Sequence, residues 1–239
     1  MLFNKIVLIA ALYIVNINAM QIIGHRGACG YEPDNTVLSF NKALELSVDM
    51  VELDVQACKT GELVIFHDFQ LGELGNISDM PFEQIRSILL QKRGQIPVLE
   101  EVINCINRRV PINIELKGLG VTKAVCLLLQ EYFKKGWCKS DFCVSSFHHQ
   151  EALSFREIID DIPIGFLYRY TFDIDEISQL KKNDFVGLHV EQVSQELVHK
   201  LHEKEIKVYV YTVNDYETAN ALKGLGVDGI FSNYPDVVR

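Results

Sequence analysis

From residue 21 to the C-terminus, short β-branched or apolar runs alternate with amphipathic segments that have the period of a helix. Runs of roughly four to eight apolar residues are typical of buried strands, whereas apolar residues three and four positions apart indicate helices. This alternation predicts a parallel sheet covered by helices, because parallel neighbours are joined by long crossovers. We expect strands at 21–23, 50–55, 112–116, 142–145, 164–167, 186–190, 208–212 and 228–231, and helices at 36–46, 82–90, 99–107, 122–133, 150–159, 174–181, 195–203 and 216–222.

Eight strands of this kind in a chain of 239 residues indicate a (β/α)8 TIM barrel. A doubly wound open sheet is the alternative, but no Gly-x-Gly-x-x-Gly turn follows the first strand. After the second strand, Thr60-Gly61 turns the chain into a short run at 62–66, which only an antiparallel hairpin allows. Residues 68–97 then form a short insertion, and no linker divides residues 20–239 into two domains.

The first nineteen residues resemble a secretory signal peptide. Lys5 precedes an apolar run at 6–15, and Ala19 is a suitable cleavage site. The run is shorter than the roughly 20 residues of a membrane span, so no stable span is expected in the mature chain. An uncleaved anchor or a helix covering the barrel are the alternatives. Cleavage predicts an exported protein, periplasmic or secreted; otherwise the chain is membrane-anchored or cytoplasmic. Six cysteines in an exported chain permit disulfides.

The net charge excludes one class of partner. With 23 Lys and Arg against 32 Asp and Glu, the formal charge is −9. A nucleic-acid-binding protein needs a basic face, so we expect no nucleic-acid partner. A small phosphate-bearing ligand is compatible with this charge, because a few local cations can outweigh the global sign. The sequence does not predict the oligomeric state.

Carboxylates lie where strands of the predicted barrel end. Glu52 and Asp54 close the second strand, and Glu115 lies near the end of the strand at 112–116. Residues two apart on a strand point to the same face, which inside a barrel is the interior. A divalent cation would relieve the repulsion of such buried carboxylates, and oxygen ligands favour Mg²⁺ or Ca²⁺. The alternative is a pair of salt bridges to Arg26 and Lys117.

Histidines and cations share this rim. His25 and His67 are candidates for proton transfer, because their ordinary pKa suits acid and base catalysis near neutral pH. Arg26 and Lys117 supply positive charge for phosphate oxygens. Together with the carboxylates, this inventory is typical of metal-assisted phosphodiester hydrolysis. His189 is a weaker candidate at a strand end, and the remaining histidines lack this context.

Several motifs carry a family resemblance. They are Gly24-His25-Arg26-Gly27-Ala28, Glu32-Pro33-Asp34-Asn35-Thr36, Glu52-Leu53-Asp54-Val55, Phe66-His67-Asp68, Ile96-Pro97-Val98-Leu99-Glu100-Glu101, Ile114-Glu115-Leu116-Lys117, Ser146-Phe147, Tyr211-Thr212-Val213-Asn214 and Gly226-Val227-Asp228-Gly229-Ile230. In order and spacing the chain resembles the glycerophosphodiester phosphodiesterase family from about residue 21 to the C-terminus. Asp34 stands where the family usually has Glu, Tyr211 stands where Trp is usual, and the region 68–95 is short.

The resemblance implies a (β/α)8 fold and hydrolysis of glycerophosphodiesters, the deacylated phospholipids, to sn-glycerol 3-phosphate and an alcohol. By position it implies that Glu52, Asp54 and Glu115 bind one divalent cation, and that His25 and His67 form the acid–base pair. It further implies that Arg26 and Lys117 hold the phosphate, and that Phe147 and Tyr211 line the glycerol or head-group pocket. Lysophospholipase D activity on the same site is one alternative, and a non-catalytic barrel that binds phosphodiesters is another.

Overall fold

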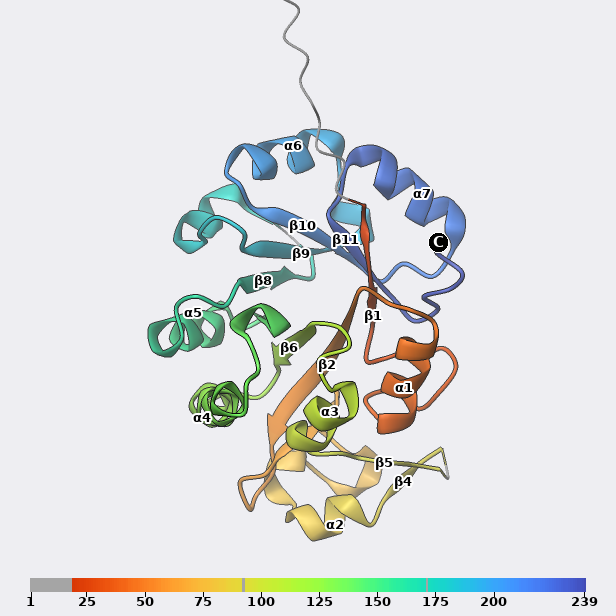
Figure 1. Ribbon diagram of the computed structural model, residues 1–239, viewed down its shortest axis with the longest axis vertical. Helices are drawn as coiled ribbons and strands as arrows, with labels where there is room; N and C mark the ends of the chain where they lie inside the picture. Colours follow the sequence, from red (N-terminus) through yellow and green to blue (C-terminus); the bar gives the residue numbers. More distant parts are fainter. Residues whose placement is uncertain (1–18, 92, 171) are drawn as a thin grey trace, which may run out of the picture.

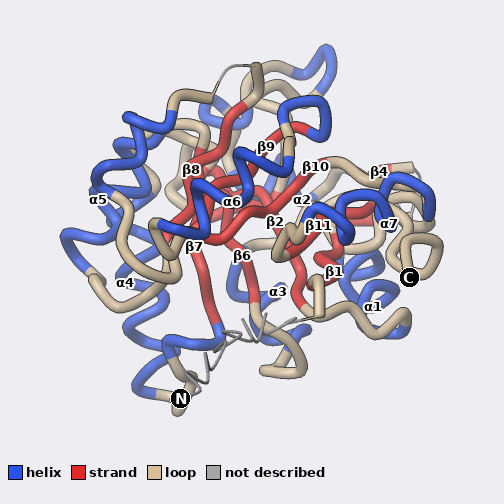
Figure 2. Tube along the Cα trace, turned by 90° about the horizontal axis from the view of Figure 1, so that it is seen from above, coloured by secondary structure: helices blue, strands red, loops and turns tan. Residues whose placement is uncertain are grey.

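The computed structural model describes residues 19–91, 93–170 and 172–239, so the predicted signal segment lies outside the described residues except for Ala19. Eight parallel strands form a closed barrel, in which the first strand pairs with both the last and the second. Figure 2 shows these strands at the centre with helices around them. The predicted TIM barrel is confirmed. Its strands are β1 (Gln21–Gly24), β2 (Met50–Ala57), β6 (Ile112–Leu116), β7 (Phe142–Ser146), β8 (Ile164–Tyr168), β9 (Phe185–His189), β10 (Lys207–Tyr211) and β11 (Gly229–Ser232).

Helices join successive strands and surround the barrel (Figure 1). Polar caps set where several of them begin: Thr36 Oγ1 accepts from the backbone N–H of Ser39, and the Asp215 carboxylate accepts from that of Thr218. None of the helices in the described ranges has the length and apolar content of a membrane span. The α-helices are α1 (Val37–Glu45), α2 (Phe82–Arg86), α3 (Leu99–Ile106), α4 (Thr122–Lys134), α5 (His149–Ile158), α6 (Gln195–Glu203) and α7 (Tyr216–Leu225).

Two predicted helices differ from the structure. The helix expected at 82–90 ends at Arg86, and the chain continues into a small hairpin of β4 (Leu89–Leu90) and β5 (Gly94–Gln95). The helix expected at 174–181 is a 3-10 helix, Ile174–Gln179. It ends because the backbone N–H of Lys181 bonds the buried Asp184 carboxylate instead of a helical carbonyl. Local side-chain acceptors of this kind compete with helical bonding.

The barrel has two apolar layers that follow from strand alternation. Odd-numbered residues of β2, from Val51 to Val55, pack outward against the helices. Even-numbered residues face the interior, where Met50 joins an apolar cluster that fills the barrel. That interior cluster contains Ile23, Met50, Cys143, Leu167, Phe185, Tyr209 and Phe231. The next inward positions of β2, Glu52 and Asp54, are polar yet almost fully buried. A layer of apolar side chains therefore lies in the barrel interior beneath a layer of buried charged side chains.

Residues 58–91 and 93–98, the hairpin segment, lie largely outside the barrel, at the lower end of Figure 1. β3 (Leu63–Ile65) pairs antiparallel with β2, as the Thr60-Gly61 turn predicts. The segment is not a loose excursion, because it packs around its own apolar cluster. The buried members of this cluster are Cys58, Val64, Leu71, Ile77, Met80, Ile85 and Ile96.

Candidate active site

The β1–α1 loop makes a tight turn that brings Arg26 over β2. Arg26 and Gly27 both have positive φ, at 52° and 85°. A Cβ on Gly27 would lie 2.4 Å from Ser39 Oγ, so only glycine fits there. Ser39 Oγ donates to the Arg26 carbonyl at 2.8 Å, which ties the turn to α1. The turn directs the Arg26 backbone N–H at Glu52 Oε2, 2.9 Å away.

The three predicted carboxylates meet inside the barrel. Asp54 on β2 stands directly opposite Glu115 on β6, and Glu52 lies two residues earlier on the same face. Contrary to expectation, Glu52 and Asp54 do not close their strand, because β2 continues to Ala57 where it pairs with β3. One carboxylate oxygen from each of the three lies within 4.8 Å of the others. The sequence prediction that these groups converge is therefore confirmed.

Two cations face the three carboxylates. Arg26 Nε lies 3.3 Å from Asp54 Oδ2, and Lys117 Nζ lies 3.1 Å from Glu115 Oε1 and 3.6 Å from Asp54 Oδ1. Both salt bridges considered for these cations are thus formed. They do not balance the cluster, since three buried negative groups meet two positive ones. Glu52 is the member whose side chain has no cationic partner within ion-pairing distance in the described chain.

The pKa values reflect this imbalance. Burial, followed by the charges of Asp54 and Glu115, holds the pKa of Glu52 well above its ordinary value. Burial and Asp54 likewise raise the pKa of Glu115 to about 7. Burial alone would raise the pKa of Asp54 as well, but Arg26 and Lys117 outweigh it and lower that pKa. Buried Glu52 Oε1 has no hydrogen-bond partner among the described residues. An unpartnered buried oxygen among all-oxygen donors fits a hard divalent cation.

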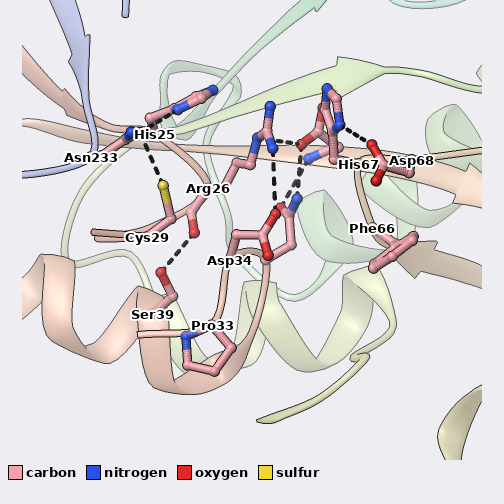
Figure 3. A network of polar contacts seen from close by, with 12 residues as sticks. His25, Arg26, Cys29, Pro33, Asp34, Ser39, Phe66, His67, Asp68 and Asn233 are labelled. Carbon is pink, nitrogen blue, oxygen red and sulfur yellow. Dashed lines mark hydrogen bonds and ion pairs between the residues drawn. The ribbon is translucent and has the colours of Figure 1, made fainter. Parts of the chain in front are cut away.

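His25 directly follows β1, next to Arg26. Its Nδ1 is 2.7 Å from Asn233 Oδ1, which also accepts from the Cys29 thiol at 3.0 Å (Figure 3). With the amide oxygen as acceptor, Nδ1 carries the proton and Nε2 keeps its lone pair. Burial, with a smaller contribution from Arg26, lowers the pKa of His25 to about 4. Burial also raises the pKa of Cys29 to about 12, so this thiol is a donor here and not a nucleophile.

His67 approaches from the hairpin segment. Its Nδ1 lies 2.6 Å from Asp68 Oδ1, on the far side of Arg26 from His25 (Figure 3). Gln56 fixes this turn, because its Nε2 donates to the carbonyls of Phe66 and Asp68 at 2.7 and 2.8 Å. Burial lowers the pKa of His67, while the Asp54 and Asp68 carboxylates oppose that shift. The two histidines therefore have different partners, an amide for one and a carboxylate for the other.

Sequence reasoning did not assign three residues that position this site. Asn35 Nδ2 donates to Asp54 Oδ2 at 2.8 Å, Gln56 holds the His67 turn, and Asn233 orients His25. Gln56 continues the inward alternation of Glu52 and Asp54, which is a signal that could have identified it. Asn35 directly precedes the helix expected at 36–46, and its role depends on a long-range contact that spacing does not reveal.

Aromatic and polar groups line a hollow of about 330 Å³ above the cluster. Phe147 and Tyr211 both lie in its wall, with ring centroids 5.9 Å apart, and Tyr211 Oη donates to the Tyr168 carbonyl at 2.6 Å. His189 also reaches this wall, whereas His202 bonds Asp228 away from it. All nine predicted site residues thus lie in or beside one cluster, and eight of them line the hollow together: His25, Arg26, Glu52, His67, Glu115, Lys117, Phe147 and Tyr211.

The cysteines form no disulfide. All six are free thiols, and Cys126 and Cys143 are buried in apolar surroundings. The disulfides that export would permit are therefore absent from the described residues.

Comparison with known proteins gives consistent results. The profile of the glycerophosphoryl diester phosphodiesterase family matches residues 25–237. The chain is 31% identical over 242 residues to a glycerophosphodiester phosphodiesterase of Bacillus altitudinis, covering 90% of this chain and 95% of the relative. A human lysophospholipase D is 23% identical over 265 residues, covering 91% and 84%.

A solved structure is similar in both fold and sequence. It is that of an Oleispira antarctica phosphodiesterase in complex with the product sn-glycerol-3-phosphate. Its TM-score is 0.82 at 25% identity, and the match covers 91% of this chain and 94% of that one.

Proposed function

The chain belongs to the glycerophosphoryl diester phosphodiesterase family, and is thus a phosphoric diester hydrolase; on this premise we propose that it hydrolyses glycerophosphodiesters with a divalent cation and two histidines. Water and the diester give sn-glycerol 3-phosphate and the free alcohol. The observation that carries the proposal is the unpartnered Glu52 Oε1 within a buried carboxylate cluster that two histidines flank.

Glu52, Asp54 and Glu115 would hold the cation. The donors are all oxygen atoms, which suits Mg²⁺ or Ca²⁺. When bound, such a cation supplies positive charge that polarises a phosphoryl oxygen. Arg26 and Lys117 lie against the same carboxylates, so they flank the position of the phosphate and stabilise its charge in the transition state. Phe147 and Tyr211 would bound the space beside it for the glycerol or the head group.

The partners of the histidines support distinct roles. His25 keeps a free Nε2 and a low pKa, so it accepts the proton of the attacking hydroxyl, that of water or of the glycerol 2-position. His67 bonds a carboxylate, which stabilises its protonated form, so it donates a proton to the leaving alcohol oxygen. Asn233 and Asp68 are the residues that orient the two rings.

The first test is release of glycerol 3-phosphate from glycerophosphocholine and glycerophosphoethanolamine, with Mg²⁺, Ca²⁺ or EDTA. We expect release with a divalent cation and none with EDTA. Glu52→Gln, which keeps the shape of the side chain and removes its charge, should abolish the metal-dependent release. Folded protein that releases product equally in EDTA would contradict the metal assignment.

Lysophospholipase D activity is a second candidate. Phe69 is 53% exposed and lines a second hollow that adjoins Phe147, which offers apolar surface beside the site. The similarity to a human lysophospholipase D points the same way. Rates that rise with acyl-chain length on lysophospholipids would favour this activity, whereas faster cleavage of the deacylated diester favours the first proposal.

A further inference from the structure

Arg169 is a cation at the site that none of the assignments above uses. It follows β8 directly and is exposed. It lines both the catalytic hollow and the second hollow, which has a volume of about 380 Å³. His67, Lys117 and Phe147 also line both, so the two spaces adjoin along one wall. His67 is the proposed proton donor to the leaving alcohol. A diester whose scissile phosphate sits at the carboxylate cluster would therefore extend that alcohol toward Arg169.

The charge of Arg169 is not balanced. Across residues 19–91, 93–170 and 172–239, no carboxylate lies within ion-pairing distance of its guanidinium. Two carboxylates line the second hollow, but each bonds another group: Asp68 bonds His67, and Glu115 bonds Lys117. A guanidinium in this position is available to an anion from solution, which it can contact with two parallel hydrogen bonds.

The ring of Phe147, which lines both hollows, already faces two cations. Arg169 Cζ lies 5.4 Å from the Phe147 ring centroid, and Lys117 Nζ lies 5.7 Å from the same centroid. A quaternary ammonium or amino head group that sought this ring would meet like charge. The second hollow is therefore unfavourable to a cationic alcohol and favourable to an anionic one.

From these observations we infer that the preferred substrates are glycerophosphodiesters whose alcohol carries a second phosphate, which Arg169 binds. This inference rests on the proposed function, because it concerns the leaving-group side of the same site. Water cleaves the ester bond between phosphorus and the alcohol oxygen. The products are glycerol 3-phosphate and the phosphorylated alcohol, whose oxygen takes up a proton.

Two matched substrate pairs test the inference. Glycerophosphoinositol 4-phosphate and glycerophosphoinositol differ by one monoester phosphate. Bis(glycerophospho)glycerol and glycerophosphoglycerol differ by one further glycerophosphate unit joined as a diester. We expect kcat/KM to be at least about tenfold higher for the member with the extra phosphate in one or both pairs, the effect of one charge-assisted contact. The pair that shows the preference identifies the source of the second phosphate.

Variants of Arg169 test whether this side chain causes the preference for the substrate with the extra phosphate. Arg169→Gln should bring the ratio of kcat/KM within a pair close to one, and Arg169→Glu should invert it. Arg169→Lys, which keeps the charge without the guanidinium fork, should retain part of it. Lys204→Gln removes one exposed cation outside both hollows and should leave the ratio as in the wild type. Raising the ionic strength should lower the wild-type ratio, because Arg169 is exposed.

The outcomes separate the two proposals. Equal kcat/KM within both pairs, or a preference that survives Arg169→Gln, would overturn the inference while leaving the hydrolase assignment intact. Faster cleavage of glycerophosphocholine than of either phosphorylated substrate would overturn it as well. Release from none of the diesters with any cation would overturn the proposed function, and the inference with it.

Discussion

The barrel and the hairpin segment each contribute one histidine to the site, and they do so differently. His25 directly follows a barrel strand and is half-buried, with an amide as its partner. His67 lies in the turn after β3, half-buried, beside an exposed carboxylate. In the barrel, the imidazole of His25 has a neutral amide partner, which favours its neutral form. In the hairpin segment, at the edge of the barrel, the charged partner of His67 stays exposed to water. The scaffold thus gives the two histidines the different surroundings that the proposed roles of proton acceptor and proton donor require.

The largest effects should come from removing either imidazole. His25→Ala and His67→Ala should each lower kcat on a natural diester by roughly 10²–10⁴. A 4-nitrophenyl ester of glycerol 3-phosphate sharpens the comparison, because its leaving group departs without a proton. On that substrate His67→Ala should recover most of its activity and His25→Ala should not. Steady-state kinetics on both substrates measures the difference.

The opposite pattern would reverse the roles of the two histidines. If His25→Ala alone is rescued by the nitrophenyl ester, the barrel histidine is the acid and the segment histidine the base. Circular dichroism of both variants serves as the control that each remains folded.

The two regions should also respond differently to loss of core packing. Ile114 in β6 and Ile85 in α2 are both fully buried, but in separate clusters. Truncating either to Ala should cost about 2–5 kcal/mol in free energy of unfolding of the region that contains it. Ile114→Ala should lower the urea midpoint of the whole domain. Ile85→Ala should instead increase hydrogen exchange mainly within residues 58–98.

Uniform loss of protection across the barrel in Ile85→Ala would contradict this separation. It would show that the hairpin segment unfolds only together with the barrel.

The same two regions mark how far the sequence predicts the structure. Each barrel strand is predictable, because a strand buried on both faces leaves a short continuous apolar run in the sequence. Glu52, Asp54 and Glu115 converge as strand geometry requires. The hairpin segment was less predictable. Its elements are only a few residues long, so no period can establish itself, and the expected helix at 82–90 gave way to β4.

The contacts that orient the two histidines could not be predicted from the sequence either. Asn233 lies 208 residues from His25 in the chain, and their contact exists only because β1 pairs with β11 when the barrel closes. Gln56 likewise acts on residues that the β2–β3 hairpin returns to it. Spacing along a strand predicts which face a residue shares, but not which loop the fold brings above it.

A smaller effect should appear in the pH dependence of kcat/KM. Asp68→Asn removes an anion that raises the pKa of His67, so that pKa falls. The acid must be protonated, and the alkaline limb should therefore move to lower pH. Asn233→Asp places a carboxylate beside His25 and raises its pKa from about 4. The base must be unprotonated, and the acidic limb should therefore move to higher pH. Both limbs should move by on the order of one pH unit.

Asp68→Asn and Asn233→Asp thus narrow the pH profile of kcat/KM, the first from the alkaline side and the second from the acidic side. Movement of the same limb in both variants would show that one histidine alone controls the profile, and would remove the distinction between the barrel and segment histidines.

The smallest expected effect concerns the ion pair that ties the hairpin segment to the barrel. Arg86 in α2 contacts both carboxylate oxygens of Glu101 in α3, at 2.7 and 2.8 Å, and also donates to the Ile96 carbonyl. The pair is about one-third exposed, so water and salt weaken it, and Arg86→Gln should cost at most about 1 kcal/mol in free energy of unfolding. Lys134→Gln, which breaks an exposed pair within α4, is the matched control and should change nothing measurable. Urea titrations at low and high salt should show the Arg86 effect shrinking with ionic strength, and an effect of several kcal/mol would mean that this one contact, more than the apolar cluster, holds His67 over the barrel.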